Sequence, residues 1–543
     1  QNTQKKSGER IFQKLLGFTG FHTMEHHEDL EPPVASKVSS RSLTREVPQR
    51  FLRGVQFRDF LAFGGQSFNQ KRSHIPLKPC KTAGFDTFIS HDWQTSAWLK
   101  YGALLLLLNA KAAAIATLLV SITFGVLIEY EVVPLTPWAL SIGYLTFVIV
   151  LLFWQNFRDA FFQPRIAFLD SLTIPQDDEA SKEECILALS GFLACSKKLT
   201  ILWSESYSDR LWCIYEFAAF MRNARGRPVQ AIPVTLPLLL ALHAVWWLAC
   251  RLLTLLLWQA LEISVFELKF GLTFSSLCLM YVLTCPFQYI LGMRMTKNLE
   301  QLRSKLHHFR VQDAKCSCCT KGHKTQSGEE IPCDRELIYQ SFQEWYGAND
   351  DMQTALEAFN QAVRNQLGDE ILKACGGRQM IPLHLFIYVV FSTSTPFLIT
   401  RIPIAFAQAR EHALTSTWSF CVVVLRDLLR SWAQFFLAML FYLWASKITW
   451  SNTHDACWRH CASMVFSLFA AATPSLAFLA LTWTSHDNWY PLVSFPLLFC
   501  FALWLLSLEC ACKQASTRVD STLRDSPASL HNVEDNESDS FSI

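Results

Sequence analysis

Long apolar runs alternate with polar stretches along the chain. The first two, at 112–128 and 135–154, each approach the roughly 17–25 residues that an α-helix needs to cross a bilayer. Further apolar runs occupy 237–258, 272–291, 381–399, a stretch ending at Trp444, 461–483 and 490–508. The pattern predicts a polytopic α-helical membrane protein with about eight spans of roughly 20 residues each.

Basic residues cluster beside the ends of these runs. The clusters at 158–165, 222–227 and 294–310 fall on one side of the membrane if successive spans alternate in direction. Lys and Arg are enriched in cytosolic loops, so we expect this side to be the cytosol. Because an even number of spans returns the chain to its starting side, both termini are predicted to be cytosolic.

Composition favours the same class of protein. Charged residues make up 17% of the chain and hydrophobic residues 51%, whereas soluble proteins carry about 25% charged residues. The net charge of +2 gives no electrostatic basis for binding nucleic acid. Many of the 18 cysteines lie inside apolar runs, where a thiol behaves as a small hydrophobic group. We therefore expect the lipid bilayer as a partner, and no nucleic acid.

The polar stretches divide the chain into regions. Residues 1–80 are polar and basic, which predicts a flexible arm. An α/β domain is expected in two parts, 81–110 and 155–234, separated by a transmembrane hairpin at 111–154. The remaining regions are two spans at 235–292, a cytosolic helical region with cysteines at 293–380, about four spans of roughly 20 residues at 381–511, and an acidic, Ser-rich tail at 512–543.

The α/β domain is expected from short strands that alternate with helices. Ser181-Lys-Glu-Glu184 predicts a capping box, in which the Ser hydroxyl and Glu carboxylate satisfy free N–H groups at a helix start. Alternation at this spacing indicates a parallel sheet, and Pro233 confines the last strand to an edge or strand end. Strands are predicted at 85–90, 166–170, 199–204 and 229–234, and helices from 95, at 181–196 and at 209–222.

Four segments of this domain resemble the Toll/interleukin-1 receptor (TIR) family. They are Phe85-Asp-Thr-Phe-Ile-Ser90, Phe168-Leu-Asp170, Leu199-Thr-Ile-Leu-Trp-Ser204 and Arg210-Leu-Trp-Cys-Ile-Tyr-Glu216, the last similar to the family's Ser-x-Trp-Cys-x-x-Glu box. The resemblance covers 83–110 and 160–234. It departs from the family where two spans are inserted, where the loop after Asp170 lacks the usual glycine, and where a fifth strand is missing or displaced.

The resemblance implies a flavodoxin-like sheet with the first strand between the second and third. Ligands of such sheets bind beyond the carboxyl ends of the strands, where strand order reverses. Polar loop residues are also common without a function. The candidate substrate-binding residues are Ser90, His91, Asp92, Trp93, Asp170, Tyr207 and Trp212, and Ser204, Glu205 and Ser206 belong to the same predicted rim.

Glu216 is the candidate catalytic residue. It shares a helix face with Trp212 and Phe220, and no basic residue stands three or four positions away. Burial would raise the pKa of this carboxyl, as suits a general acid or base; a structural role in holding its helix is the alternative. TIR domains that cleave NAD use a Glu at the matching position, so the resemblance implies Glu216 as catalytic and NAD as substrate. Other TIR domains are only adaptors.

A second cluster of reactive side chains follows the fourth apolar run. Thiolates and an imidazole this close in sequence could hold a tetrahedral Zn²⁺, although the spacing lacks the paired Cys-x₂-Cys pattern. Juxtamembrane thiols open to acylation are the alternative. The residues are Cys316, Cys318, Cys319, His323 and Cys333.

These features predict a membrane-embedded TIR-like signalling protein. Its cytosolic domain would associate with other TIR domains and hydrolyse NAD to nicotinamide and ADP-ribose products. A non-catalytic scaffold is one alternative. A transporter or channel with a regulatory TIR-like insert is the other, and it depends on Arg426, Asp427 and Arg430, which interrupt an apolar run. These charges either line a polar cavity, or lie at the membrane interface or pair with one another at helical spacing.

Overall fold

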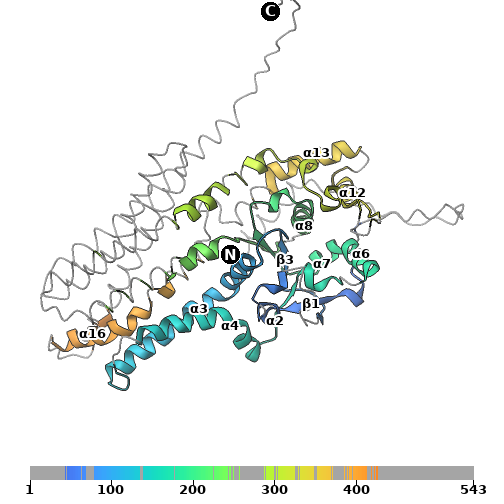
Figure 1. Cartoon of the computed structure of the whole chain (residues 1–543). Coiled ribbons are helices and arrows are strands. Elements are labelled where there is room, and N and C mark those ends of the chain that lie inside the picture. Colours follow the sequence, from blue (N-terminus) through green and yellow to red (C-terminus); the bar gives the residue numbers. More distant parts are fainter. Residues whose placement is uncertain are drawn as a thin grey trace, which may run out of the picture. The chain divides into compact units, whose positions relative to one another are not determined.

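The chain folds as a mixed α/β structure that is mostly helical and contains one sheet with mainly parallel pairing (Figure 1). The computed structural model describes residues 43–68, 79–134, 139–242, 289–324, 328–347, 351–367 and 391–411, with short gaps, and single positions elsewhere. The predictions for 461–483, 490–508, the tail from 512, the charges at 426–430, and most of 246–288 and 368–390 lie outside the described residues.

Four parallel strands form the centre of the sheet. β3 (Thr87–His91) lies between β4 (Ile166–Phe168) and β5 (Leu199–Trp203), and β6 (Val229–Pro233) follows β5. Phe88 pairs with Phe168 on one side and with Leu199 on the other. The four predicted strands are confirmed to within two residues, and their spatial order agrees with the order expected from the resemblance. Pro233 ends an outer strand, as its missing N–H requires.

Two antiparallel strands extend the sheet beyond β4. β1 (Arg53–Gln56) pairs with β4 and with β2 (Cys80–Lys81). A Cβ on Gly54 would lie 2.3 Å from Ile166 Cγ2, so only glycine fits there. The expectation of a flexible arm over 1–80 is therefore wrong for this part, where η1 (Gln49–Phe51), α2 (Phe57–Ala62) and η2 (Gln66–Phe68) are also ordered. Residues 1–42 lie outside the description.

Alternate residues of each strand face two separate cores. Phe88 and Phe168 stack with ring centroids 4.6 Å apart, and Phe168 lies equally close to Phe192 of a covering helix. The opposite face, with Ile89, packs against the start of the long helix α3 (Ala97–Glu129). The elements around the first core include α6 (Glu179–Leu187), α7 (Leu189–Ala194), η3 (Tyr207–Asp209) and α8 (Leu211–Arg222), whereas α5 (Asp170–Thr173) packs against the second core through Leu172.

The start of α6 differs from the prediction. Asp178, not Ser181, caps this helix, and its carboxylate accepts a hydrogen bond from the Ser181 backbone N–H. Both residues are good caps, so residue type alone does not decide between them. The helix predicted at 181–196 is also divided, because α6 ends at Leu187 and α7 begins at Leu189.

Two described helices are long and apolar enough to cross a membrane. α3 has 33 residues and α4 (Ala139–Phe161) has 23, and the predicted spans at 112–128 and 135–154 fall within them, apart from 135–138, which lie outside the description. α3 is continuous across the boundary expected at 110/111. Asn109 and Gln155 join the two helices through a buried side-chain hydrogen bond of 2.7 Å. Exposed apolar side chains follow α3 at Ile115, Leu119, Ile122 and Val126, and α4 at Leu145, Val148, Leu152 and Phe157.

The described segments after residue 300 pack against the elements above. α12 (Asp334–Tyr346) and α13 (Met352–Ala362) share the core of α8, while α16 (Leu398–Glu411) lies along α3. Arg410 of α16 pairs with Glu129 at the end of α3. The other short elements are η4 (Val311–Asp313), α11 (Ser317–Thr320), the π-helix η5 (Val363–Leu367) and η7 (Thr395–Phe397).

The aromatic core under the sheet yields a stability prediction. Phe168→Ala should lower the free energy of unfolding by about 3–5 kcal/mol, because it empties a site enclosed by three phenyl rings. Denaturant unfolding of the purified protein measures this change. Phe162→Ala is the matched control, since that ring is 65% exposed. Equal effects of the two substitutions would contradict the packing described.

Candidate functional site

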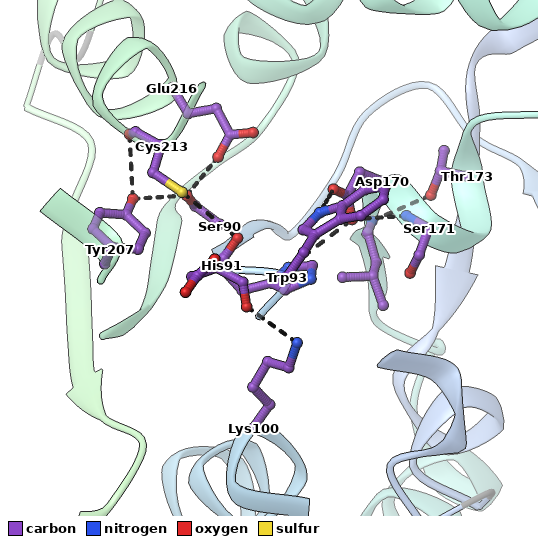
Figure 2. A network of polar contacts seen from close by, with 12 residues as sticks. Ser90, His91, Trp93, Lys100, Asp170, Ser171, Thr173, Tyr207, Cys213 and Glu216 are labelled. Carbon is purple, nitrogen blue, oxygen red and sulfur yellow. Dashed lines mark hydrogen bonds and ion pairs between the residues drawn. The ribbon is translucent and has the colours of Figure 1, made fainter. Parts of the chain in front are cut away.

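A buried network of hydroxyl and carboxyl groups joins α8 to β3 (Figure 2). Ser90, near the carboxyl end of β3, donates a hydrogen bond of 2.5 Å to Glu216 Oε2. Its Oγ also lies 2.7 Å from the Tyr207 hydroxyl, which in turn contacts the Cys213 carbonyl at 3.4 Å. All four residues are buried. The sequence predicted three of them for the site, and in the structure Ser90 contacts both Tyr207 and Glu216.

The Glu216 carboxyl is shielded from solvent. Its residue is only 8% exposed, and no ion pair joins it to a described residue. Burial raises the pKa of Glu216 to about 8, because the hydrogen bond from Ser90 offsets the loss of solvation only in part and the charge of Asp170 adds to the increase. The carboxyl is therefore mainly protonated at pH 7. The expectation of a raised pKa for this residue agrees with this environment.

A second group lies beside this network, at the ends of β3 and β4. The Trp93 indole donates a hydrogen bond of 2.6 Å to Asp170 Oδ2, and His91 Nδ1 lies 3.9 Å from Asp170 Oδ1. The Trp93 and His91 rings are parallel, with centroids 6.5 Å apart. Figure 2 shows the Trp93 ring lying across Asp170. Because Trp93 is 42% exposed, its indole offers a flat apolar surface at this edge.

The ionisable groups of this cluster titrate away from their ordinary values. Burial lowers the pKa of His91 well below its usual value, and the nearby Lys100 ammonium lowers it further. Burial raises the pKa of Asp170 to about 6, against the hydrogen bonds from Ser171 and Trp93. At pH 7 the site therefore holds a neutral imidazole beside a largely ionised carboxylate.

Asp92 orders the turn between these groups. It is buried, its carboxylate accepts hydrogen bonds from the Gln94 backbone N–H at 3.1 Å and from the Ser206 hydroxyl, and Arg210 Nε lies 3.7 Å away. The Lys100 ammonium donates to the Asp92 carbonyl at 3.2 Å. Asp92 thus positions the loops after β3 and β5 and has its acceptors occupied by protein groups. Sequence reasoning missed Lys100 and Arg210, although a lysine at the start of an apolar helix is an unusual placement.

Trp212 is the one predicted binding residue that the structure leaves apart from this network. Its indole N–H donates to Asp334 Oδ2 of α12 at 3.2 Å, and its ring lies edge-on to Tyr215 at 5.8 Å. It shares a helix with Glu216 but contacts a different partner. Trp212 therefore fastens α12 to α8.

A cavity of about 320 Å³ opens at the carboxyl ends of the central strands. Ser204, Glu205 and Ser206 of the predicted rim line it. Glu216 does not. The sequence predicted a crevice between the ends of β3 and β5. The cavity extends to β6 as well, because the turns after β3, β5 and β6 all line it. The lining residues that the sequence did not indicate include Gln94, Thr95, Ser96, Thr235 and Asn298.

The structure also brings together the predicted metal-ligating residues. Ligand atoms of Cys318, Cys319, His323 and Cys333 all lie within 4.8 Å of one another, and those of Cys316, Cys318 and Asp334 form an overlapping group. Although burial would raise it, the pKa of Cys319 is lowered to about 7 by the polar groups of His323, Cys333 and Arg335 around its sulfur. The cluster lies apart from the Glu216 network.

Comparisons of the chain with protein-family models, with curated proteins and with solved structures find no match.

The buried carboxyl yields a pH prediction. In the unfolded chain, Glu216 is ionised at any pH above the usual pKa of a glutamate. In the native state it retains its proton up to about pH 8. Stability should therefore fall as pH rises, and between pH 7 and 9 this group should cost about 1.4 kcal/mol. In Glu216→Gln that loss should be absent. The exposed control Glu179→Gln should keep the parent's pH dependence, and denaturant unfolding at both pH values decides between them.

Proposed function

We propose that the protein is a membrane-embedded signalling protein whose cytosolic TIR-like domain hydrolyses NAD, with Glu216 as the catalytic carboxyl. The observation that carries the proposal is this buried carboxyl, which has no cationic partner among the described residues and a pKa of about 8. Strongly shifted carboxyl groups near the carboxyl ends of parallel strands are characteristic of active sites.

The surroundings of Glu216 suit a dinucleotide. The exposed Trp93 ring offers stacking for a nicotinamide or adenine ring. The cavity has the hydroxyl groups of Ser96, Ser204 and Thr235 in its lining, which would bind ribose and phosphate oxygens. A ligand that lies across the ends of β3 and β5 would contact both regions.

The proposed reaction breaks the bond between the nicotinamide nitrogen and the ribose carbon. Nicotinamide leaves with the bonding electron pair, and water adds to the ribose carbon and releases one proton. Glu216, once deprotonated, would stabilise the positive charge that develops on the ribose in the transition state. Since this carboxyl is buried and bonded to Ser90 here, the reactive state requires it to be exposed. Contact with a second TIR-like domain is the proposed cause of that rearrangement.

A non-catalytic scaffold is the second candidate, and a specific observation favours it. Glu216 is hydrogen-bonded to Ser90 and does not line the 320 Å³ cavity. In this role the carboxyl fixes α8 to β3 and so maintains the surface through which TIR-like domains associate. The two candidates differ in whether the protein consumes NAD.

Nicotinamide release tests the catalytic proposal. Purified full-length protein, clustered on membranes or beads so that its domains can associate, should release nicotinamide from NAD. Glu216→Gln should reduce the rate by about 10²–10³-fold, because a preorganised charge is lost. Glu179→Gln, whose side chain is 79% exposed, should retain the parent rate.

The outcomes separate the two candidates. Absence of release by the clustered parent, or equal rates for the parent and Glu216→Gln, would rule out the enzyme and leave the scaffold. Circular dichroism of the variant shows whether it retains the fold.

We also propose that the chain crosses the membrane several times, with the α/β domain and both termini in the cytosol. Exposed apolar side chains along α3 and α4 support a lipid-facing hairpin. The buried Asn109–Gln155 hydrogen bond resembles the polar contacts that join transmembrane helices. Because β3 precedes this hairpin and β4 follows it, both strands must lie on one side of the membrane.

Thiol labelling in sealed vesicles tests this topology. A cysteine introduced at Glu179 should react with an impermeant maleimide under the same conditions as the natural, exposed Cys195. A cysteine at Val132, in the turn between α3 and α4, should show the opposite accessibility before the vesicles are opened. Identical labelling of positions 132 and 179 in intact vesicles would contradict the spanning hairpin.

A further inference from the structure

Three cysteines and a histidine converge between α11 and the start of α12. Cys318 and Cys319 belong to α11, His323 follows it, and Cys333 is the residue before α12. Backbone contacts bring the two ends of the intervening chain together. The Ile331 N–H donates to the His323 carbonyl at 2.8 Å, and an isolated antiparallel β-bridge joins Lys324 to Glu330. These backbone contacts bring Cys333 close to Cys318, Cys319 and His323, although it is at least ten residues away from them in the sequence.

The distances between the sulfur atoms fit a single tetrahedral ion. Cys318 Sγ lies 3.9 Å from Cys319 Sγ, which lies 3.7 Å from Cys333 Sγ. Zinc–sulfur bonds of about 2.3 Å in a tetrahedron place the sulfur atoms roughly 3.8 Å apart. Cys316 Sγ is only 3.1 Å from Cys318 Sγ, too close for both to bind the same ion. The spacing of Cys318, Cys319 and Cys333 therefore suits one ion, and Cys316 does not fit with them.

His323 provides the fourth donor. Its Nε2 atom is buried and has no hydrogen-bond partner among the described residues. A buried nitrogen without a partner is costly. The His323 backbone also adopts a positive φ of 56°, which is unfavourable for a residue with a side chain. Coordination of a metal by Nε2 would satisfy this nitrogen and account for the strained backbone.

Groups around the cluster are arranged as outer partners of a metal centre. The Asp334 backbone N–H donates to Cys318 Sγ at 3.3 Å. Arg335 lies beside the Cys319 sulfur and offers positive charge. Three thiolates leave one net negative charge on a zinc centre, which the N–H donor and the guanidinium would stabilise.

We propose that Cys318, Cys319, Cys333 and His323 Nε2 bind one Zn²⁺ as a structural site. Binding replaces the three thiol protons, which pass to solvent, and fills all four positions, so no site remains for substrate. Zinc is the metal that three thiolates and an imidazole in a tetrahedron favour.

The ion would join α11 to the start of α12, in a segment that packs against the helix that carries Glu216. The Lys315 carbonyl, next to the cluster, accepts a hydrogen bond from the Leu211 backbone N–H at the start of α8. α12 contacts α8 through the Trp212–Asp334 hydrogen bond and through Trp345, stacked on Tyr215 at 5.6 Å. Zinc would therefore fix α11 to the start of α12, and Lys315, Asp334 and Trp345 of the same segment contact α8. This role does not depend on NAD chemistry.

Metal analysis of the full-length protein in detergent, purified without chelators, tests the site. We expect about one zinc per chain. Cys333→Ser and His323→Ala should lose the bound zinc on gel filtration. Cys195→Ser, which removes an exposed thiol elsewhere, should retain it. Removal of zinc from the parent should increase hydrogen exchange at 334–346 and at the start of α8.

A second measurement covers the case in which the variants do not fold. Cobalt added to the zinc-depleted parent should give the absorption of tetrahedral Co²⁺ with thiolate ligands, and zinc should abolish it. The proposal is overturned by a parent that binds neither ion, by iron in place of zinc, by a Cys316–Cys318 disulfide in the isolated protein, or by a folded Cys333→Ser protein that keeps its zinc.

Discussion

The parallel pairing of β3 with β4 is the constraint on which the rest of the structure depends. These strands are neighbours in the sheet, yet the chain between them runs out along the 33 residues of α3 and returns along the 23 residues of α4. At about 1.5 Å per residue, α3 is roughly 50 Å long and α4 roughly 35 Å. The first part of α3 packs on the sheet through Ala103 and Leu104, and the remainder matches the length of α4. One helix therefore serves both the sheet and the hairpin.

α8 has a comparable role on the other face of the sheet. Its N-terminus receives the segment around Lys315, its outer side contacts α12 through Trp212 and Tyr215, and Glu216 reaches Ser90 on β3. The carboxyl network and the cysteine cluster are thus attached to the same twelve-residue helix. A change in the position of α8 would therefore alter the contacts of both the carboxyl network and the segment that holds the cysteine cluster. The protonated state of Glu216 at neutral pH favours the position described here, because it avoids a buried charge.

The central strands could be predicted because their sequences fix them locally. Leu199–Trp203 is an apolar run bounded by polar residues, and burial on both faces requires such a run. β1 carries no comparable signal, since only Gly54 and Val55 of its four residues are buried. Its pairing depends on the close approach of Gly54 to Ile166, a contact between distant segments. Asp178 and Ser181 are both good caps, so residue type alone did not decide which of them caps α6.

Some residues of the candidate site could likewise be predicted from the sequence, and others could not. The absence of a basic neighbour on its helix singled out Glu216, and the order of the strands brought Ser90 and Tyr207 close to it. Helix periodicity placed Trp212 on the same helix face as Glu216 and so predicted it for the site. The actual partner of Trp212 is Asp334 of α12, which the sequence of α8 does not indicate. The 320 Å³ cavity includes Met295 and Asn298, which follow a distant apolar run. The convergence of the cysteines required the backbone contacts at Lys324 and Glu330, which spacing alone does not reveal.

The hairpin between neighbouring strands also constrains biogenesis. During synthesis β3 leaves the ribosome before α3 and α4, whereas the strand that flanks it becomes available only after both helices are made. Until then, the edge of β3 with Phe88 and Ile89 lacks its partner and is open to chaperones or to aggregation. If the hairpin enters a bilayer, completion of the sheet must wait for that event. In that case the α/β domain could complete its fold only in chains whose hairpin had already entered the membrane.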